Sequence, residues 1–131
     1  MFNQINPTKE SIKNLAASYP KDTPVTMLNI LRFKTKVDDG SESGLAAYQR
    51  YGALAQAHLK GAGAKVVWAG EVVHTIIGDA AQQPHQVLLI EYPSVDHFLS
   101  MILSEAYQAI THDRTIALEY GGLLACQQIS K

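Results

Sequence analysis

The sequence has little of what a disulfide framework, a membrane span or a nucleic-acid surface requires. Its 131 residues contain one cysteine, Cys126, so no internal disulfide can form and a reducing compartment suits the chain. No apolar run approaches the roughly 18 residues of a membrane span, and no basic-then-apolar leader opens the chain. Its 11 basic and 12 acidic residues form no basic stripe, which argues against a nucleic-acid binder. We therefore expect a cytoplasmic protein with neither membrane nor nucleic-acid partners.

Motifs for metals, phosphates and nucleophiles are also missing. The 5 histidines show no spacing typical of a metal site, and there is no Gly-rich phosphate loop or nucleophilic-serine motif. Cys126 has no companion motif and is interpreted as a small core residue rather than a nucleophile. We expect no metal and no bound cofactor, so the functional interpretation depends on individual side chains.

The sequence does have enough apolar residues for one packed domain. They make up 47% of the chain, and a chain of this length buries roughly two thirds of its unfolded surface. Residues 1–22 are expected to form a helical extension, which Asn6 caps and Pro20 ends. Residues 23–131 are expected to form the main domain.

Within the main domain the apolar pattern switches between the period of a strand and that of a helix. It predicts strands at 25–34, 65–78, 86–92 and 123–129. It predicts helices at 45–60, from 94, and at 105–120. Gly121 and Gly122 are expected to end the last helix, and Gly70 to mark a bulge or a close backbone approach. This order is the split βαβ, ferredoxin-like plan, an α+β fold whose antiparallel four-stranded sheet has helices on one face.

Such a sheet has a second face without helices. Along residues 25–34, Val25, Met27 and Leu31 alternate with Thr26, Leu28 and Ile30. Whichever set lies away from the helices forms an apolar patch that needs cover. A symmetric homodimer that joins two sheets is the expected solution.

Six segments carry a resemblance to a known family: MLNILRF, AYQRYGAL, VVWAGEV, IIGD, IEYPS and AYQAITHDRTIAL. In this order and spacing they resemble the bacterial family catalogued as domain of unknown function 1330, within the dimeric α/β-barrel superfamily. The resemblance covers about residues 24–125. It implies a ferredoxin-like subunit whose sheet pairs with a second copy to close a barrel, and it implies no particular reaction. The chain departs from the family where Asp113 replaces a common histidine, and where His85 and Gln86 replace a common Trp-Asp pair.

The last predicted helix carries the most suggestive pair of charged residues. Asp113 falls on the apolar face of residues 105–120, where a carboxylate must be paired, hydrogen-bonded or protonated. In a pocket it can act as a catalytic acid or base, although a structural ion pair is the more frequent case. Arg114 offers a fork for a carboxylate of a ligand or of a neighbouring subunit.

Other side chains are candidates for contacts with a ligand. Asn29 can orient a carbonyl group or tie down a loop. Tyr48 and Tyr51, one turn apart, can line a cavity or pack in the core, and Trp68 offers a stacking surface. The expected site has Asp113 as its catalytic group and the following ligand contacts: Asn29, Tyr48, Tyr51, Trp68 and Arg114.

Two classes of function stay open at this point. The first is a small-molecule-binding protein, with or without cofactor-independent catalysis, that takes a small acidic or carbonyl-bearing aromatic compound. The second is a non-catalytic ligand-binding or structural homodimer. A cavity that Asp113 and Arg114 both enter favours the first class. A filled core with both groups in salt bridges favours the second.

Overall fold

One four-stranded sheet organises the molecule, and every strand in it runs antiparallel to its neighbours. The computed structural model describes residues 5–129. Its strands are β1 (Val25–Phe33), β2 (Lys65–Glu71), β3 (Gln86–Tyr92) and β4 (Leu118–Cys126), in the order β2-β3-β1-β4. This arrangement confirms the predicted ferredoxin-like plan.

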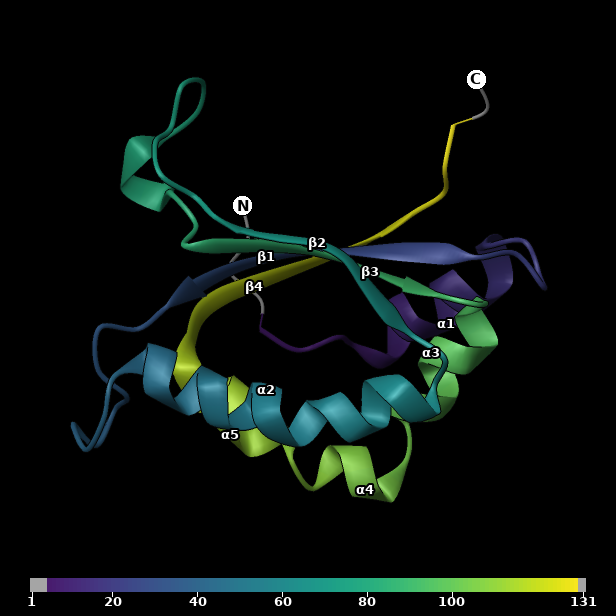
Figure 1. The fold of residues 1–131 in the computed structure, drawn as a ribbon, viewed down its shortest axis with the longest axis horizontal. Coiled ribbons are helices and arrows are strands. Elements are labelled where there is room, and N and C mark those ends of the chain that lie inside the picture. Colours follow the sequence, from purple (N-terminus) through teal and green to yellow (C-terminus); the bar gives the residue numbers. More distant parts are fainter. Residues whose placement is uncertain (1–4, 130–131) are drawn as a thin grey trace.

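The helices lie on one face of the sheet (Figure 1). They are α1 (Lys9–Ser18), α2 (Gly44–Gly61), α3 (Val95–Ile102), α4 (Glu105–Gln108) and α5 (Thr111–Ala117). A 3-10 helix, η1 (Ala80–Gln82), precedes β3 and lies apart from this layer. We call the covered side of the sheet the inner face and the opposite side the outer face. No helix within residues 5–129 has the length and apolar character needed to cross a membrane.

Serine side chains begin three of these helices. The hydroxyls of Ser43, Ser94 and Ser104 each accept a hydrogen bond from the backbone N–H three residues further on. Helix α1 begins later than predicted. Its cap is Thr8, because the Ser11 hydroxyl and the Thr8 hydroxyl each accept from the other residue's backbone N–H.

Strand β1 shows which set of alternating residues is buried. Val25, Met27 and Leu31 are at most 2% exposed and face the helices. Leu28 and Ile30, which point to the outer face, are only half-buried. Asn29 therefore lies on the inner face, beneath the helices.

The second strand is shorter than predicted and has a bulge. β2 ends at Glu71 because its partner strand β3 begins at Gln86, directly opposite. A register shift between Val66 and Trp68 then brings Trp68 opposite Leu89, on the outer face. The Trp68 indole approaches Gly70 closely, and a Cβ on Gly70 would clash with that ring. The chain from 72 to 79 leaves the sheet as a loop.

The predicted helix at 105–120 is broken into α4 and α5, and β4 begins at Leu118. Pairing with β1 explains this difference, because Gly121 and Gly122 lie opposite Leu31 and Ile30 in the ladder. The two glycines therefore belong to a strand and do not end a helix. A Cβ on Gly121 would lie 3.1 Å from the Arg114 guanidinium, so this glycine leaves room for that side chain.

Candidate ligand-binding cavity

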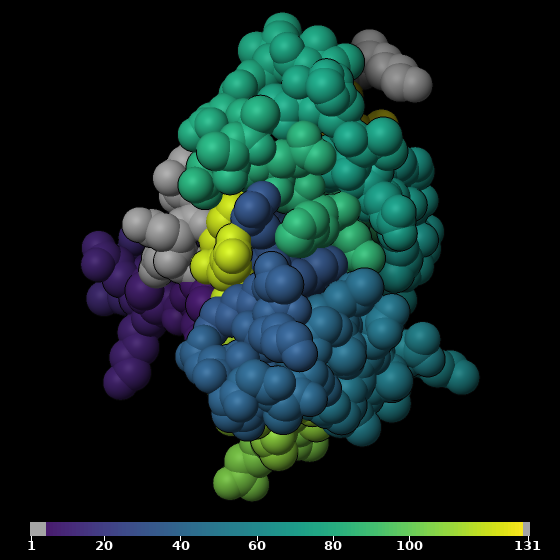
Figure 2. Space-filling model, turned by 90° about the vertical axis from the view of Figure 1, so that its left-hand side faces the viewer, coloured from purple at the N-terminus to yellow at the C-terminus, as the bar shows by residue number. Residues whose placement is uncertain are grey.

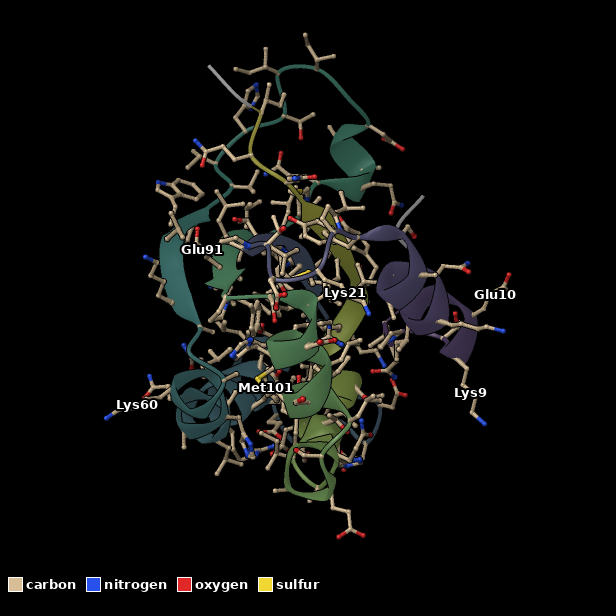
Figure 3. All side chains as sticks on the ribbon, turned by 90° about the vertical axis from the view of Figure 1, so that its right-hand side faces the viewer. Lys9, Glu10, Lys21, Lys60, Glu91 and Met101 are labelled. Atoms are coloured by element: carbon tan, nitrogen blue, oxygen red, sulfur yellow. The ribbon has the colours of Figure 1, made fainter. Side chains whose placement is uncertain are left out.

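A cavity of about 880 Å³ lies between the inner face of the sheet and the helices. This volume lies within the roughly 300–1,000 Å³ range of small-molecule sites. Most of its lining is apolar, and Met101 of α3, labelled in Figure 3, is part of it. The apolar lining residues include Met27, Ile90, Phe98, Met101 and Ile102.

Small residues on α2 help to leave this space open. Gly52 and Ala55 both line the cavity, and a Cβ on Gly52 would meet no atom within 4 Å. Glycine in the middle of a helix lowers helical stability relative to alanine. The helix therefore carries a residue that costs stability at the point where the cavity needs room.

Arg114 of α5 lines the cavity and is half-buried. Its Nη1 donates a hydrogen bond to the carbonyl oxygen of Ile5 at 2.5 Å. It forms no salt bridge with any carboxylate of residues 5–129. A carbonyl oxygen satisfies one donor but leaves the positive charge unbalanced, so the guanidinium remains an attractive group for an anion.

Asp113 does not share the cavity with its sequence neighbour Arg114. Its Oδ1 accepts a hydrogen bond from Arg50 Nη2 at 2.9 Å, and the same guanidinium binds both carboxylate oxygens of Glu42. Hydrogen bonding to Arg50 holds the pKa of Glu42 below its usual range. Asp113 does not line the cavity. The structure thus places it in an ion-pair network between α2 and α5, which was the alternative to a catalytic role.

Two of the predicted aromatic residues lie in the cavity wall and one does not. Tyr48 and Tyr51 of α2 both line the cavity. Trp68 is 55% exposed on the outer face, on the opposite side of the sheet. Asn29 lines the cavity from β1 and donates through Nδ2 to the Met27 carbonyl at 3.2 Å. The structure therefore brings Asn29, Tyr48, Tyr51 and Arg114 together and separates Trp68 and Asp113 from them.

Sequence reasoning missed two further tyrosines of the cavity, Tyr92 and Tyr107. Leu88, Ile90 and Tyr92 occupy every second position of β3, and all three lie on its inner face. The alternation of this strand could therefore have predicted that Tyr92 faces the helices. Tyr107 lies on the short helix α4, whose direction no local pattern predicts.

Direct contacts join three of the four cavity tyrosines, namely Tyr48, Tyr51 and Tyr107. The Oη atoms of Tyr51 and Tyr107 lie 2.5 Å apart, and the rings of Tyr48 and Tyr51 have centroids 5.4 Å apart. Burial raises the pKa of Tyr48 to about 12. Burial also raises the pKa values of Tyr51 and Tyr92, so these phenols are neutral hydrogen-bond donors near neutral pH.

The segment before β1 completes the wall. Asn6, Lys9 and Ile12 line the main cavity, and a second cavity of about 500 Å³ lies between α1 and β4. Arg114 and Ile12 line both cavities, so Arg114 stands where the two spaces meet. No aspartate or glutamate is among the described residues that line the main cavity, which makes its charged lining entirely positive.

Comparison with known proteins places this chain in a family. The sequence profile of the domain of unknown function DUF1330 matches residues 41–125. The protein RPA0582 of Rhodopseudomonas palustris, of unknown function, is 30% identical and has a TM-score of 0.91, with 98% of this chain and 99% of that chain covered. None of the curated proteins compared with this chain matches it.

Two more distant structures share the fold alone. A dimeric, ferredoxin-like protein of unknown function from Bacteroides fragilis is 9% identical, with a TM-score of 0.55 over 83% of this chain and 100% of that chain. A candidate antibiotic biosynthesis monooxygenase from Bacteroides thetaiotaomicron is 11% identical, with a TM-score of 0.50 over 82% of this chain and 91% of that chain.

Proposed function

The chain belongs to the DUF1330 family, and we propose that it binds a small molecule that joins an acidic group to an apolar, aromatic frame. The observation that carries this proposal is Arg114, which enters a largely apolar cavity of about 880 Å³ without a carboxylate partner among residues 5–129. The cavity is the binding site, and Arg114 is the anchor for the acid.

The energetics of the guanidinium support an anionic ligand. A charge removed from water costs free energy unless an opposite charge or several hydrogen bonds compensate for it. The single carbonyl of Ile5 compensates for part of this cost. A ligand carboxylate would accept two parallel hydrogen bonds from the fork and would also balance the charge.

The remaining lining supports an aromatic frame. Phe98 and Tyr92 pack edge to face with ring centroids 5.1 Å apart, and both line the cavity with apolar neighbours from the sheet. Asn29 contributes a side-chain carbonyl oxygen that accepts no hydrogen bond from a described residue. Such a lining, apolar with a few polar groups, is typical of sites for small organic molecules.

The same site can serve a binding protein or a cofactor-independent enzyme. The ion pair of Asp113 with Arg50 favours a structural role for that carboxylate and leaves catalysis without an assigned acid or base. The structure named as a candidate antibiotic biosynthesis monooxygenase shares the fold and is a reason to test turnover. Binding is therefore the function proposed, and catalysis is the alternative to be measured.

A second copy of the chain is proposed to cover the outer face. Trp68 and Leu124 are 55% and 45% exposed there, beside the half-buried Leu28 and Ile30. The loop 72–79 rises beyond the sheet in Figure 1 and belongs to the teal top of the molecule in Figure 2, and its Ile76 is 89% exposed. An apolar surface of this kind on a small domain marks a partner site. The Bacteroides fragilis protein of the same fold is dimeric.

A binding experiment tests the proposed ligand class. Calorimetric titration with aromatic carboxylates, such as benzoate and 3-phenylpropionate, is compared with the matching neutral carboxamides. We expect the carboxylates to bind and the amides to bind at least tenfold more weakly. Arg114→Gln should weaken carboxylate binding by about 2 kcal/mol or more, because the other charge is left buried without its partner.

Arg50→Gln is the matched control, since it also removes one guanidinium but outside the cavity wall. It should leave the affinity for carboxylates unchanged. Equal affinities for acids and amides, or equal losses in the two variants, would contradict Arg114 as the anchor.

A further inference from the structure

Four tyrosines line the cavity from three different elements. Tyr48 and Tyr51 come from α2, Tyr92 from the end of β3 and Tyr107 from α4. Tyr107 shares a hydrogen bond with Tyr51, and its phenol acts to raise the pKa values of Tyr48 and Tyr92. Tyr51, Tyr92 and Tyr107 are each 9% exposed or less.

The cluster has more O–H donors than its hydrogen bonds use. Tyr51 and Tyr107 share one hydrogen bond, in which one hydroxyl donates and the other accepts. The accepting hydroxyl keeps its own proton. The hydroxyls of Tyr48 and Tyr92 have no hydrogen-bond partner among residues 5–129. Three O–H donors are therefore free to bind an oxygen inside the cavity.

No fully buried side-chain oxygen of residues 5–129 lacks a hydrogen-bond partner, so the unpaired hydroxyls of Tyr48 and Tyr92 are open to the cavity. Phenylalanine would pack at the same positions without placing a polar group there. The rings alone account for the packing of the cluster, but they do not account for its hydroxyls. A ligand oxygen that accepts hydrogen bonds does account for them, since four hydroxyls at one cavity are then compensated in the complex.

The electrostatics of the cluster favour a negatively charged oxygen. The positive charge of Arg114 acts to lower the pKa values of Tyr48 and Tyr51, so its field reaches the hydroxyls. Burial outweighs that field for the tyrosines, which stay protonated. A more acidic hydroxyl on a ligand would lose its proton in the same field, because three neutral donors and a guanidinium would stabilise the resulting anion.

We infer that the tyrosine cluster is a donor site for an ionised phenol or enol oxygen of the ligand, distinct from the carboxylate held by Arg114. This inference rests on the proposed function and narrows it to hydroxyaromatic, or similarly enolic, carboxylic acids. Tyr48, Tyr92 and Tyr107 are the donors, and Tyr51 positions Tyr107 through their shared hydrogen bond. His58 packs edge-on against Tyr107, with ring centroids 5.7 Å apart, and contributes the other titratable ring beside the cluster.

Three nitroaromatic probes separate the two parts of the site. The first, 2-nitrobenzoate, has the acid alone; 4-nitrophenol has the hydroxyl alone; 5-hydroxy-2-nitrobenzoate has both. Absorbance of the nitrophenolate reports ionisation of the bound probe directly. We expect 5-hydroxy-2-nitrobenzoate to bind about tenfold more tightly than 2-nitrobenzoate. The apparent pKa of its hydroxyl should fall by about one unit on binding, a tenfold preference for the anion.

Variants then assign that effect to the cluster. Tyr107→Phe and Tyr48→Phe should each abolish most of the ionisation shift and weaken binding of the hydroxylated probe about tenfold, while binding of 2-nitrobenzoate stays unchanged. Tyr92→Phe is the replacement if either variant does not fold. Tyr120→Phe is the control, because that hydroxyl donates to the Gln82 carbonyl and does not line the cavity.

The outcomes distinguish the two proposals. If 2-nitrobenzoate binds through Arg114 but the added hydroxyl changes neither affinity nor ionisation, the inference about the cluster is overturned and the proposed function stands. If 4-nitrophenol binds and ionises in a Tyr107-dependent way while no carboxylate binds, the cluster is supported and the anchor role of Arg114 is overturned. If no probe binds, both are overturned.

Discussion

The hydroxyl oxygens of Tyr51 and Tyr107 lie 2.5 Å apart although 56 positions separate the two residues in the chain. This contact joins the long helix α2 to the one-turn helix α4 at the cavity wall. It explains why α4, with four residues, holds a defined position: its only buried side chain is tied to the interior by a polar contact as well as by packing.

That contact predicts a measurable coupling between the two tyrosines. Tyr51→Phe or Tyr107→Phe should each lower the free energy of unfolding by about 1 kcal/mol, because the remaining hydroxyl loses its buried partner. The double variant should cost less than the sum of the two single variants. Urea denaturation of the four proteins measures the coupling, and strictly additive changes would show that the hydroxyls do not interact.

Gly52 offers a way to change the cavity without touching a polar group. Gly52→Ala should raise the free energy of unfolding by about 1 kcal/mol through helix propensity, and it should leave ligand binding intact. Gly52→Leu should keep that gain but fill part of the cavity, since a Cβ at this position meets open space. Binding of aromatic carboxylates should then fall sharply in Gly52→Leu alone, as calorimetry would show. Unchanged binding in Gly52→Leu would place the ligand elsewhere.

The network of Arg50 with Glu42 and Asp113 predicts a specific acid dependence of stability. Because the folded-state pKa of Glu42 lies below its ordinary value of 4.5, ionised Glu42 stabilises the fold above that pH. This contribution is lost as the pH falls through the lowered folded-state pKa. Arg50→Gln should therefore reduce stability near neutral pH and should approach the wild type in acid. Urea denaturation across this range tests the sign, and a difference that grows in acid would contradict it.

If a second copy of the chain covers the outer face, one charged substitution on that face should disrupt the dimer. Wild-type protein should be a dimer by light scattering at micromolar concentration. Leu124→Arg should give a monomer, because it places a charge on the apolar outer face next to Leu28. Leu54→Arg is the control, on an exposed part of α2 that is 48% accessible, and should stay dimeric. A monomeric wild type would overturn the proposed dimer.

Local patterns predicted the architecture because they follow from the backbone itself. Alternation along β1 placed Met27 and Asn29 on one face and Leu28 on the other, since successive strand residues point to opposite sides. The predicted starts of helices near 45, 94 and 105 agree with α2, α3 and α4, whose serine caps satisfy N–H groups within their own turn. The helix predicted at 105–120 was wrong at its end, because residues from Leu118 onward pair with β1, with Gly121 opposite Leu31.

The site depended on contacts that no local pattern contains. The chain alone determined that Tyr48 and Tyr51 share one side of a helix and that Arg114 and Asp113 are neighbours. Only the tertiary structure decided that Arg50 takes Asp113 away from the cavity, that a bulge turns Trp68 to the outer face, and that Tyr107 meets Tyr51. The physical reason is distance along the chain: the period of an element follows from short-range sterics, whereas strand register and the direction of a short helix follow from packing against residues far away in sequence.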